Sequence, residues 1–249
     1  MPGQNRFQNL KRFATKEMKI QQGRNMTLLE PGALLAGNIV NHVPWDYDSY
    51  NRIRGGICAS LTADWLEEKI KGSNSIFSRT PKMFKAGRDD DANQAAVRDV
   101  MIRAAPAQMN YVRSGNISTL FSAKGLEFKP ATINNDRDPH TNMAIASIER
   151  TFETLCQAED EFGIGDGLLI ELVFEPASGA GGQDQGHAVG AYKSHGRHIY
   201  FFDPNIGIYK VSSPRGFIKA WLDAYLAQNM RGSMDHQKCG ISIVRRVSA

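Results

Sequence analysis

Three residues have the types and the spacing that nucleophilic catalysis requires: Cys58, His187 and Asp203. A cysteine thiolate can attack a carbonyl carbon, a histidine can take up and return the proton, and a carboxylate can fix the tautomer of that histidine. His187 and Asp203 lie close together in the sequence, whereas Cys58 lies far before them. The sequence therefore predicts acyl chemistry through a thioester, provided that the fold brings the three side chains together.

Cys58 is expected in the first turn of an amphipathic helix. Apolar residues recur at near-helical spacing at Leu61, Trp65 and Ile70, and Gly72 suits the C-terminal stop. The unpaired N–H groups and the macrodipole at a helix start favour a thiolate. A buried structural cysteine would also fit this position. The assignment of Cys58 as nucleophile therefore depends on a base that faces it.

His187 and Asp203 are expected at one edge of an antiparallel strand pair. His187 begins the apolar run 187–192 after a Gly-rich loop, and Asp203 ends the run 198–203. In an antiparallel pair the start of one strand lies beside the end of the next, so the two side chains come within hydrogen-bonding reach. That bond would leave the other ring nitrogen to face a thiol. Taken singly, each residue would also fit a strand end or an Asp-Pro-Asn turn.

The elements that would position these residues come as helices first and antiparallel strands later. Besides the helix at Cys58, the expected helices cover about 91–111 and 141–162 and one begins at Pro214, and the expected strands cover 167–175, 187–192, 198–203, 208–211 and 240–247. The last helix has Trp221 and Tyr225 on its buried side, and we assign Trp221 to the core. This order predicts an α+β fold in which an N-terminal helical part packs on a C-terminal antiparallel sheet.

The first residues differ from the rest of the chain. Residues 1–26 contain six Lys or Arg and one acidic residue, with few large apolar side chains. We expect a flexible basic N-terminal arm over 1–26 and a single catalytic domain over 27–249. The chain of 249 residues, 41% of them hydrophobic, is long enough to bury a full core.

Composition argues against several classes of protein. The net charge is only +4, and no basic stripe is interleaved with aromatic residues, so we expect no nucleic-acid partner. Cysteines 58, 156 and 239 form no CxxC motif, and His195 and His198 have no nearby cysteine or acid cluster, so we expect no metal and no cofactor. No apolar run approaches the ~20 residues of a membrane span, and no secretory signal is recognisable. We expect no transmembrane segment and no conventional signal peptide.

Three blocks of sequence resemble the YopT/AvrPphB family of bacterial effector cysteine proteases. They are GGICASL around Cys58, GHAVG around His187 and YFFDPNIG around Asp203. The resemblance implies a papain-like fold and a Cys-His-Asp triad formed by these three residues. It also implies a secreted virulence protein that cleaves a host protein in the host cell cytosol, and it suggests a secretion chaperone as a further partner.

The resemblance also implies an oxyanion hole. In the family this hole combines the backbone N–H of the nucleophile with a polar side chain a few residues upstream. On this sequence these groups would be the N–H of Cys58 and the side chain of Asn51, which is the nearest amide before it.

Two other functions remain open from the sequence. A transglutaminase-like or deamidase toxin would use the same three residues, with an amine or water attacking a thioester derived from glutamine. A non-catalytic binding module would keep the papain-like shape without a working site. The first differs from a protease in its products, and the second would lack contact between Cys58 and His187.

Overall fold

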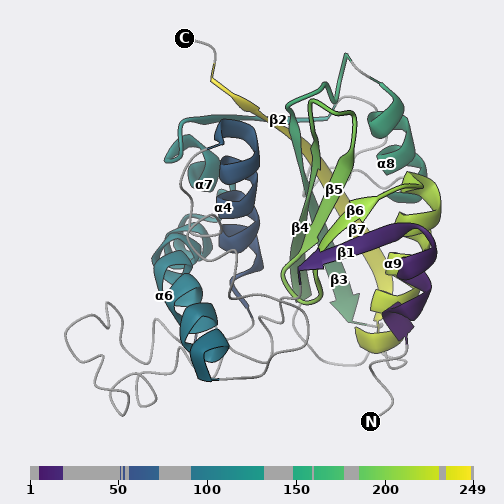
Figure 1. Cartoon of the computed structure of the whole chain (residues 1–249). Coiled ribbons are helices and arrows are strands. Elements are labelled where there is room, and N and C mark those ends of the chain that lie inside the picture. The colour runs from purple at the N-terminus through teal and green to yellow at the C-terminus, as the bar shows by residue number, and fades with distance from the viewer. Residues whose placement is uncertain are drawn as a thin grey trace.

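Figure 1 shows a computed structural model of the chain. The structure describes residues 6–18, 51, 53, 56–72, 91–131, 148–158, 160–176, 185–229 and 234–247. Among these residues, no helix has both the length and the apolar composition that a membrane span needs.

A seven-stranded, fully antiparallel sheet forms the centre of the molecule. Its strand order is β1-β6-β5-β4-β3-β7-β2. The strands are β1 (Ala14–Met18), β2 (Leu126–Pro130), β3 (Gly167–Pro176), β4 (Gln185–Lys193), β5 (Ile199–Asp203), β6 (Gly207–Val211) and β7 (Met234–Arg246). The strands expected from residue 167 onward are all present. Their β-branched and aromatic content was therefore a good indicator of strand structure.

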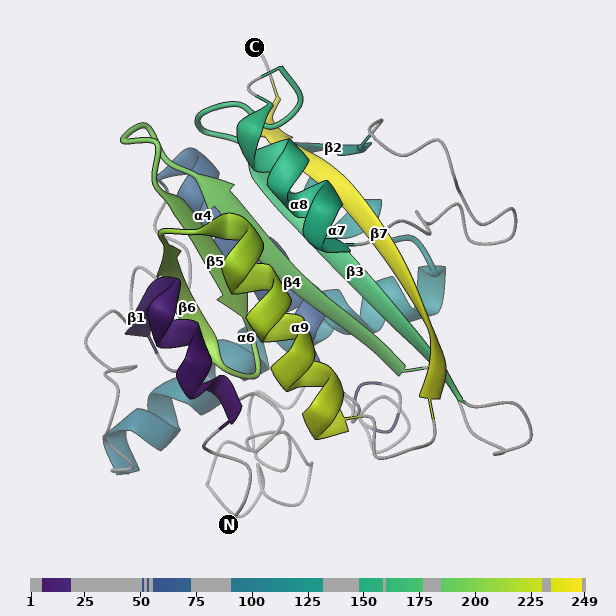
Figure 2. The same ribbon diagram turned by 90° about the vertical axis from the view of Figure 1, so that its right-hand side faces the viewer.

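Helices cover both faces of this sheet. On one face lie α4 (Cys58–Lys71), α6 (Asp91–Ser114) and α7 (Ser118–Ser122), and on the other lie η1 (Arg6–Arg12), α8 (Ile148–Gln157) and α9 (Pro214–Asn229) (Figures 1 and 2). The helix expected over 141–162 is present as α8 but ends earlier, at Gln157, since residues 160–162 form a turn; residues 141–147 lie outside the described part. The predicted α+β class is confirmed, with the helix of Cys58 packed on the antiparallel sheet.

Each face of the sheet has its own hydrophobic core. In β5, Phe202 packs with Trp65 of α4, whereas its neighbour Phe201 packs with Phe217 and Trp221 of α9. Successive strand residues point to opposite faces, so a sheet that is covered on both sides needs apolar residues at consecutive positions. The central strands therefore show continuous apolar runs, and both faces give a helix a rigid surface to pack on.

A glycine in β4 allows α4 to lie unusually close to the sheet. A Cβ atom at Gly190 would come within 3.0 Å of both Thr62 Cγ2 and Trp65 Cζ3. Thr62 also donates a hydrogen bond of 3.2 Å from its hydroxyl to the carbonyl of Ala188. These contacts fix α4 along β4, the strand that begins beside His187.

Residues 6–18, which fall within the expected N-terminal arm, form η1 and β1 and pack on the rest of the molecule. Leu10 of η1 is fully buried, and β1 adds an edge strand to β6, with Ala14 opposite Val211. Phe13 lies against Gly216 at the start of α9, where a Cβ would approach its ring to 2.6 Å. Leu10, Phe13 and Ala14 thus join this segment to the core that α9 shares. Residues 1–5 and 19–26 lie outside the described part, and the flexible arm over 1–26 and the single domain over 27–249 stay predictions.

Candidate active site

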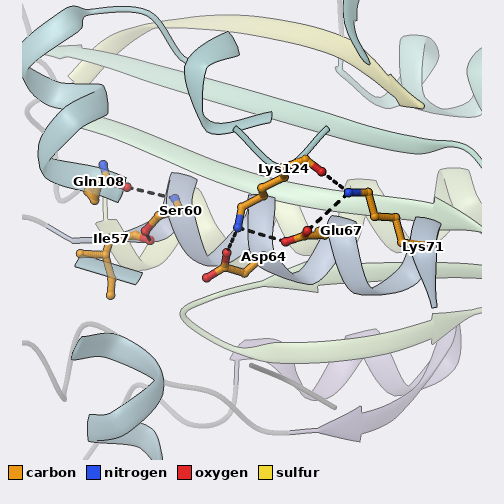
Figure 3. A network of polar contacts seen from close by, with 7 residues as sticks. All are labelled: Ile57, Ser60, Asp64, Glu67, Lys71, Gln108 and Lys124. Carbon is orange, nitrogen blue, oxygen red and sulfur yellow. Dashed lines mark hydrogen bonds and ion pairs between the residues drawn. The ribbon is translucent and has the colours of Figure 1, made fainter. Parts of the chain in front are cut away.

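The helix that carries Cys58 begins abruptly. Cys58 is the first residue of α4, and Gly56 before it has a φ of 141°, which L side chains rarely adopt. The N-cap residue, Ile57, makes no side-chain capping bond. Gln108 of α6 caps the helix start instead: its Oε1 accepts a 3.0 Å hydrogen bond from the buried N–H of Ser60 (Figure 3). The first turn of α4 is thus held by a neighbouring helix.

Ion pairs hold the outer side of α4. Lys124, in the turn between α7 and β2, pairs with Asp64 and, at 3.1 Å, with Glu67 (Figure 3). Lys71 in turn donates to the carbonyl of Lys124 and pairs with Glu67 at 3.6 Å. Burial raises the pKa of Asp64, although Lys124 opposes that shift. This network stabilises the position of the helix and includes neither Cys58 nor His187.

His187 and Asp203 meet where β4 begins and β5 ends. The two strands pair antiparallel, with Gly190 opposite Phe202, and His187 Nε2 lies 3.0 Å from Asp203 Oδ1. Both side chains are buried, and that of Asp203 is wholly inaccessible. A buried carboxylate needs full hydrogen bonding. Asp203 obtains it from His187, from the N–H of Asn205 at 2.7 Å and from Trp221 Nε1 at 2.8 Å.

The side chain of Cys58 contacts the imidazole of His187. The thiol is hydrogen-bonded to the imidazole, and the backbone N–H groups of Ala188 and Ala59 also bond the sulfur. Since Nε2 of His187 is held by Asp203, the nitrogen left for Cys58 is Nδ1. The structure therefore brings the three predicted residues into one continuous chain of hydrogen bonds, from a helix start, a strand start and a strand end.

This chain shifts two pKa values in directions that favour an ion pair. Burial would raise the pKa of Cys58, but the hydrogen bond and the charge of His187 lower it overall. Burial would lower the pKa of His187, but Asp203 and Cys58 together raise it to about 10. Both shifts favour the thiolate–imidazolium pair over the neutral pair.

Two aromatic residues of α9 complete the surroundings of the histidine. The ring of Tyr225 stacks on His187 with centroids 4.9 Å apart and planes inclined by 12°. Trp221, one turn earlier, bonds Asp203 and is itself fully buried. The sequence indicated their burial but not these contacts. Their one available signal was that Trp and Tyr carry a polar group that usually finds a partner when buried.

The structure describes both groups that are expected in an oxyanion hole, the N–H of Cys58 and the residue Asn51. The N–H of Cys58 has no acceptor in the described part of the chain, and it stands at the start of α4, where such groups point outward. The next N–H but one, that of Ser60, is already taken by Gln108. Asn51 is exposed, and no described contact links it to Cys58. Its assignment to the oxyanion hole stays a prediction.

Among the described residues, no histidine interacts with the other two cysteines. Cys156 and Cys239 are buried free thiols, and burial raises the pKa of each to about 12. Such thiols are poor nucleophiles at neutral pH. Across the described ranges, no group of three or more His, Cys, Asp or Glu is arranged to hold a metal ion.

A partly buried carboxyl group lies on the α4 side of the sheet. Glu171 in β3 stands opposite Ala188 of β4, which has a small side chain, and Gly240 of β7, which has none. Burial raises the pKa of Glu171 to about 7. Burial raises the pKa of Tyr111, and the charges of Glu171 and Cys58 raise it further, so these groups share one region. No motif in the sequence marks Glu171, which lies within an apolar strand.

Glu171→Gln is expected to stabilise the protein at about pH 8 by on the order of 1–3 kcal/mol. The folded state binds the Glu171 proton more tightly than the unfolded state, where the pKa is near 4.5. Stability from this group is complete below that value and is lost as the pH rises through about 7. Urea unfolding at several pH values measures the effect. The exposed Glu127→Gln keeps Glu171 and is the control, so its stability should follow the wild-type pH dependence, which Glu171→Gln should lose; equal curves for both variants would refute the assignment.

The fold and this arrangement define a class of protein. A helix that begins at a cysteine, packed on an antiparallel sheet that supplies a histidine and an aspartate, is the architecture of papain-like cysteine peptidases. The chain belongs to the Peptidase_C58 family of cysteine peptidases, whose model, described as Yersinia/Haemophilus virulence surface antigen, matches residues 37–244. The recognised family and the class of enzyme are thus confirmed.

Three solved structures are similar to this chain. The Pseudomonas avirulence protein AvrPphB is 17% identical, with 75% of this chain and 90% of that chain covered and a TM-score of 0.38. The YopT domain of the Pasteurella multocida PfhB2 toxin is 19% identical, with 89% and 90% covered and a TM-score of 0.25. PatoxP, a cysteine protease-like domain of the Photorhabdus asymbiotica toxin PaTox, is 8% identical, with 89% and 93% covered and a TM-score of 0.22. No curated protein matches the chain.

Proposed function

We propose that this cysteine peptidase cleaves a host protein through a triad of Cys58, His187 and Asp203. The observation that carries the proposal is the hydrogen-bond chain from the Cys58 sulfur through His187 to Asp203, with a His187–Asp203 distance of 3.0 Å. The lowered pKa of Cys58 and the raised pKa of His187 agree with an activated thiolate.

In the proposed mechanism the Cys58 thiolate attacks the carbonyl carbon of the scissile peptide bond. The resulting oxyanion accepts a hydrogen bond from the N–H of Cys58, with Asn51 proposed as the second donor. His187 gives its Nδ1 proton to the leaving amine, the C–N bond breaks, and a thioester remains on Cys58. His187 then removes a proton from water, which attacks the thioester and releases the acid and the thiolate.

Asp203 keeps the imidazole oriented during both proton transfers. Its Oδ1 accepts from Nε2, so Nδ1 is the nitrogen that exchanges protons with substrate and water. The rate should accordingly rise as Cys58 ionises and should fall again as the pH passes the His187 pKa of about 10.

The substrate, the place of action and the partner are proposed from the family. Its virulence description supports a secreted protein that acts in the host cell cytosol, and a secretion chaperone is the proposed delivery partner. A peptidase acts on a protein, and the virulence description of the family supports a host protein as that substrate.

A search for new protein termini in a host-cell lysate tests this function. The lysate is treated with the wild-type protein or with Cys58→Ala and is compared by mass spectrometry. New N-termini that depend on Cys58 support peptide cleavage. Conversion of Gln to Glu, or new Gln–amine cross-links, without new termini would instead assign the deamidase or transglutaminase alternative. No Cys58-dependent product of either kind would favour the binding module.

A further inference from the structure

We propose that Trp221 and Tyr225 of α9 are positioning residues for the triad. Trp221 fixes the carboxylate of Asp203 and Tyr225 fixes the plane of the His187 ring. The proposal rests on the proposed function, because only a working triad needs such positioning. It gives α9 a role besides packing on the sheet.

The first part of the argument concerns the two oxygens of Asp203. Oδ1 accepts from His187 Nε2 and from the N–H of Asn205, whereas Oδ2 has Trp221 Nε1, at 2.8 Å, as its one donor among the described residues. The oxygens of a carboxylate are chemically equivalent, so a freely turning group would exchange them. The indole N–H can only donate, and it therefore holds Oδ2 away from the histidine and keeps Oδ1 towards it.

Trp221 is itself immobile enough for this task. Its side chain is wholly buried and meets the ring of Phe201 at 63°, with centroids 5.2 Å apart. Without its N–H, Oδ2 would be a buried carboxylate oxygen with no donor among the described residues, which is a costly state for an anion. The position of the Asp203 carboxylate therefore depends on this bond as well as on the bonds from His187 and Asn205.

The second part concerns the imidazole ring. A half-turn of the ring would put Cδ2 in the place of Nδ1 and Cε1 in the place of Nε2, and both bonds of His187 would be lost. Tyr225 lies nearly parallel to the ring at 4.9 Å, so that rotation would drive the imidazole into the phenol. The Tyr225 hydroxyl bonds the side chain of Asn205, whose N–H bonds Asp203. Tyr225 is thus linked through Asn205 to the carboxylate of Asp203.

Spacing on α9 links the two contacts. Trp221 and Tyr225 are one turn apart on the same face, and their ring centroids are 5.5 Å from each other. Helix α9 packs on the sheet through this face, and β4 and β5 carry His187 and Asp203 on the side that it covers. One helix face thus contacts both groups, and Figure 2 shows α9 lying over β4 and β5.

A matched pair of variants tests the role of Trp221. Trp221→Phe removes the N–H that bonds Asp203, while Trp65→Phe removes one that is buried without a partner in the described residues. Both residues are wholly buried, so loss of indole volume is common to the two variants. The measurement is the rate at which iodoacetamide alkylates Cys58 as a function of pH, followed by peptide mass spectrometry, because it needs no substrate.

Trp221→Phe should move the alkylation midpoint of Cys58 to higher pH and lower the rate below the midpoint by about tenfold per unit of pKa. A less firmly held Asp203 supports the imidazolium less, and a weaker imidazolium stabilises the thiolate less. Trp65→Phe should keep the wild-type midpoint. If both variants share that midpoint, the role of Trp221 is refuted. Should Trp221→Phe fail to fold, 3-benzothienylalanine at position 221 keeps the ring and removes only the N–H.

Tyr225 is tested in the same assay by the kind of side chain that replaces it. Tyr225→Leu removes the stacked ring and should raise the midpoint, whereas Tyr225→Phe keeps the ring, loses only the hydroxyl and should raise the midpoint less. Equal midpoints for Tyr225→Leu and the wild type would overturn that part of the proposal. His187→Ala separates this failure from failure of the function. If that variant also leaves the midpoint unchanged, Cys58 has no partner base and the triad itself is wrong.

Discussion

Cys58→Ala is expected to lower kcat/KM by at least about 10⁴-fold while the melting temperature stays close to that of the wild type. The substitution removes the only thiol that is bonded to a histidine among the three cysteines, so no thioester can form. Cys58 is partly buried and the alanine fits the same helix start, so little packing is lost. Cleavage of the protein substrate found in the lysate experiment measures the activity.

Cys156→Ala and Cys239→Ala are the controls for this prediction. Both remove a buried thiol from the core between the sheet and the helices α8 and α9. Their pKa values near 12 mark them as unreactive, so activity should persist in each folded variant. An active Cys58→Ala, or an inactive Cys156→Ala with an intact fold, would remove the basis for Cys58 as nucleophile.

His187→Ala is expected to lower kcat/KM by at least about 10³-fold and to raise the pKa of Cys58. Burial alone raises the pKa of this thiol, and the largest opposing influence is the hydrogen bond and charge of His187. Without the imidazole the thiol would stay protonated at neutral pH, and the leaving amine would have no proton donor. Steady-state kinetics and a pH titration of Cys58 measure the two effects.

His198→Ala is the matched control for the histidine. His198 is exposed and lies before β5, at the far end of the strand from Asp203. Its removal should change neither the rate nor the titration of Cys58. A wild-type pKa of Cys58 in His187→Ala would contradict the ion pair, whatever the effect on the rate.

Most of the sheet and the places of Cys58, His187 and Asp203 followed from local sequence patterns. Short apolar runs mark β3 to β6, and an antiparallel neighbour is the simplest connection between strands separated by a short turn. The end of β5 then has to lie beside the start of β4, which is why the histidine and the aspartate could be paired without coordinates. The helical spacing after Cys58 placed this residue at the start of α4 for the same local reason.

The contacts that involve α6 and α9 could not be read in this way. Gln108 bonds Ser60 and Trp221 bonds Asp203 because of how each helix is rotated on its neighbours, and periodicity shows only which face is apolar. Docking of β1 on β6 joins segments nearly a whole chain apart. The basic character of the N-terminal residues did not indicate the packing of residues 6–18, because Leu10 and Phe13 make its apolar contacts.

The chemistry and the reaction have different kinds of support. The hydrogen-bond chain through His187 explains how a thioester would form, and family membership establishes a cysteine peptidase. The search for new termini identifies the protein that is cleaved.

The central claim is that Cys58 is a thiolate paired with the imidazolium of His187. The difference in ultraviolet absorbance between the wild type and Cys58→Ala, followed from acid to alkaline pH, measures the thiolate of this residue alone. We predict thiolate absorbance well below the ordinary cysteine pKa of about 8.5, and its displacement to higher pH in His187→Ala. Absorbance that appears only at or above about pH 8.5 in the wild type would contradict the account.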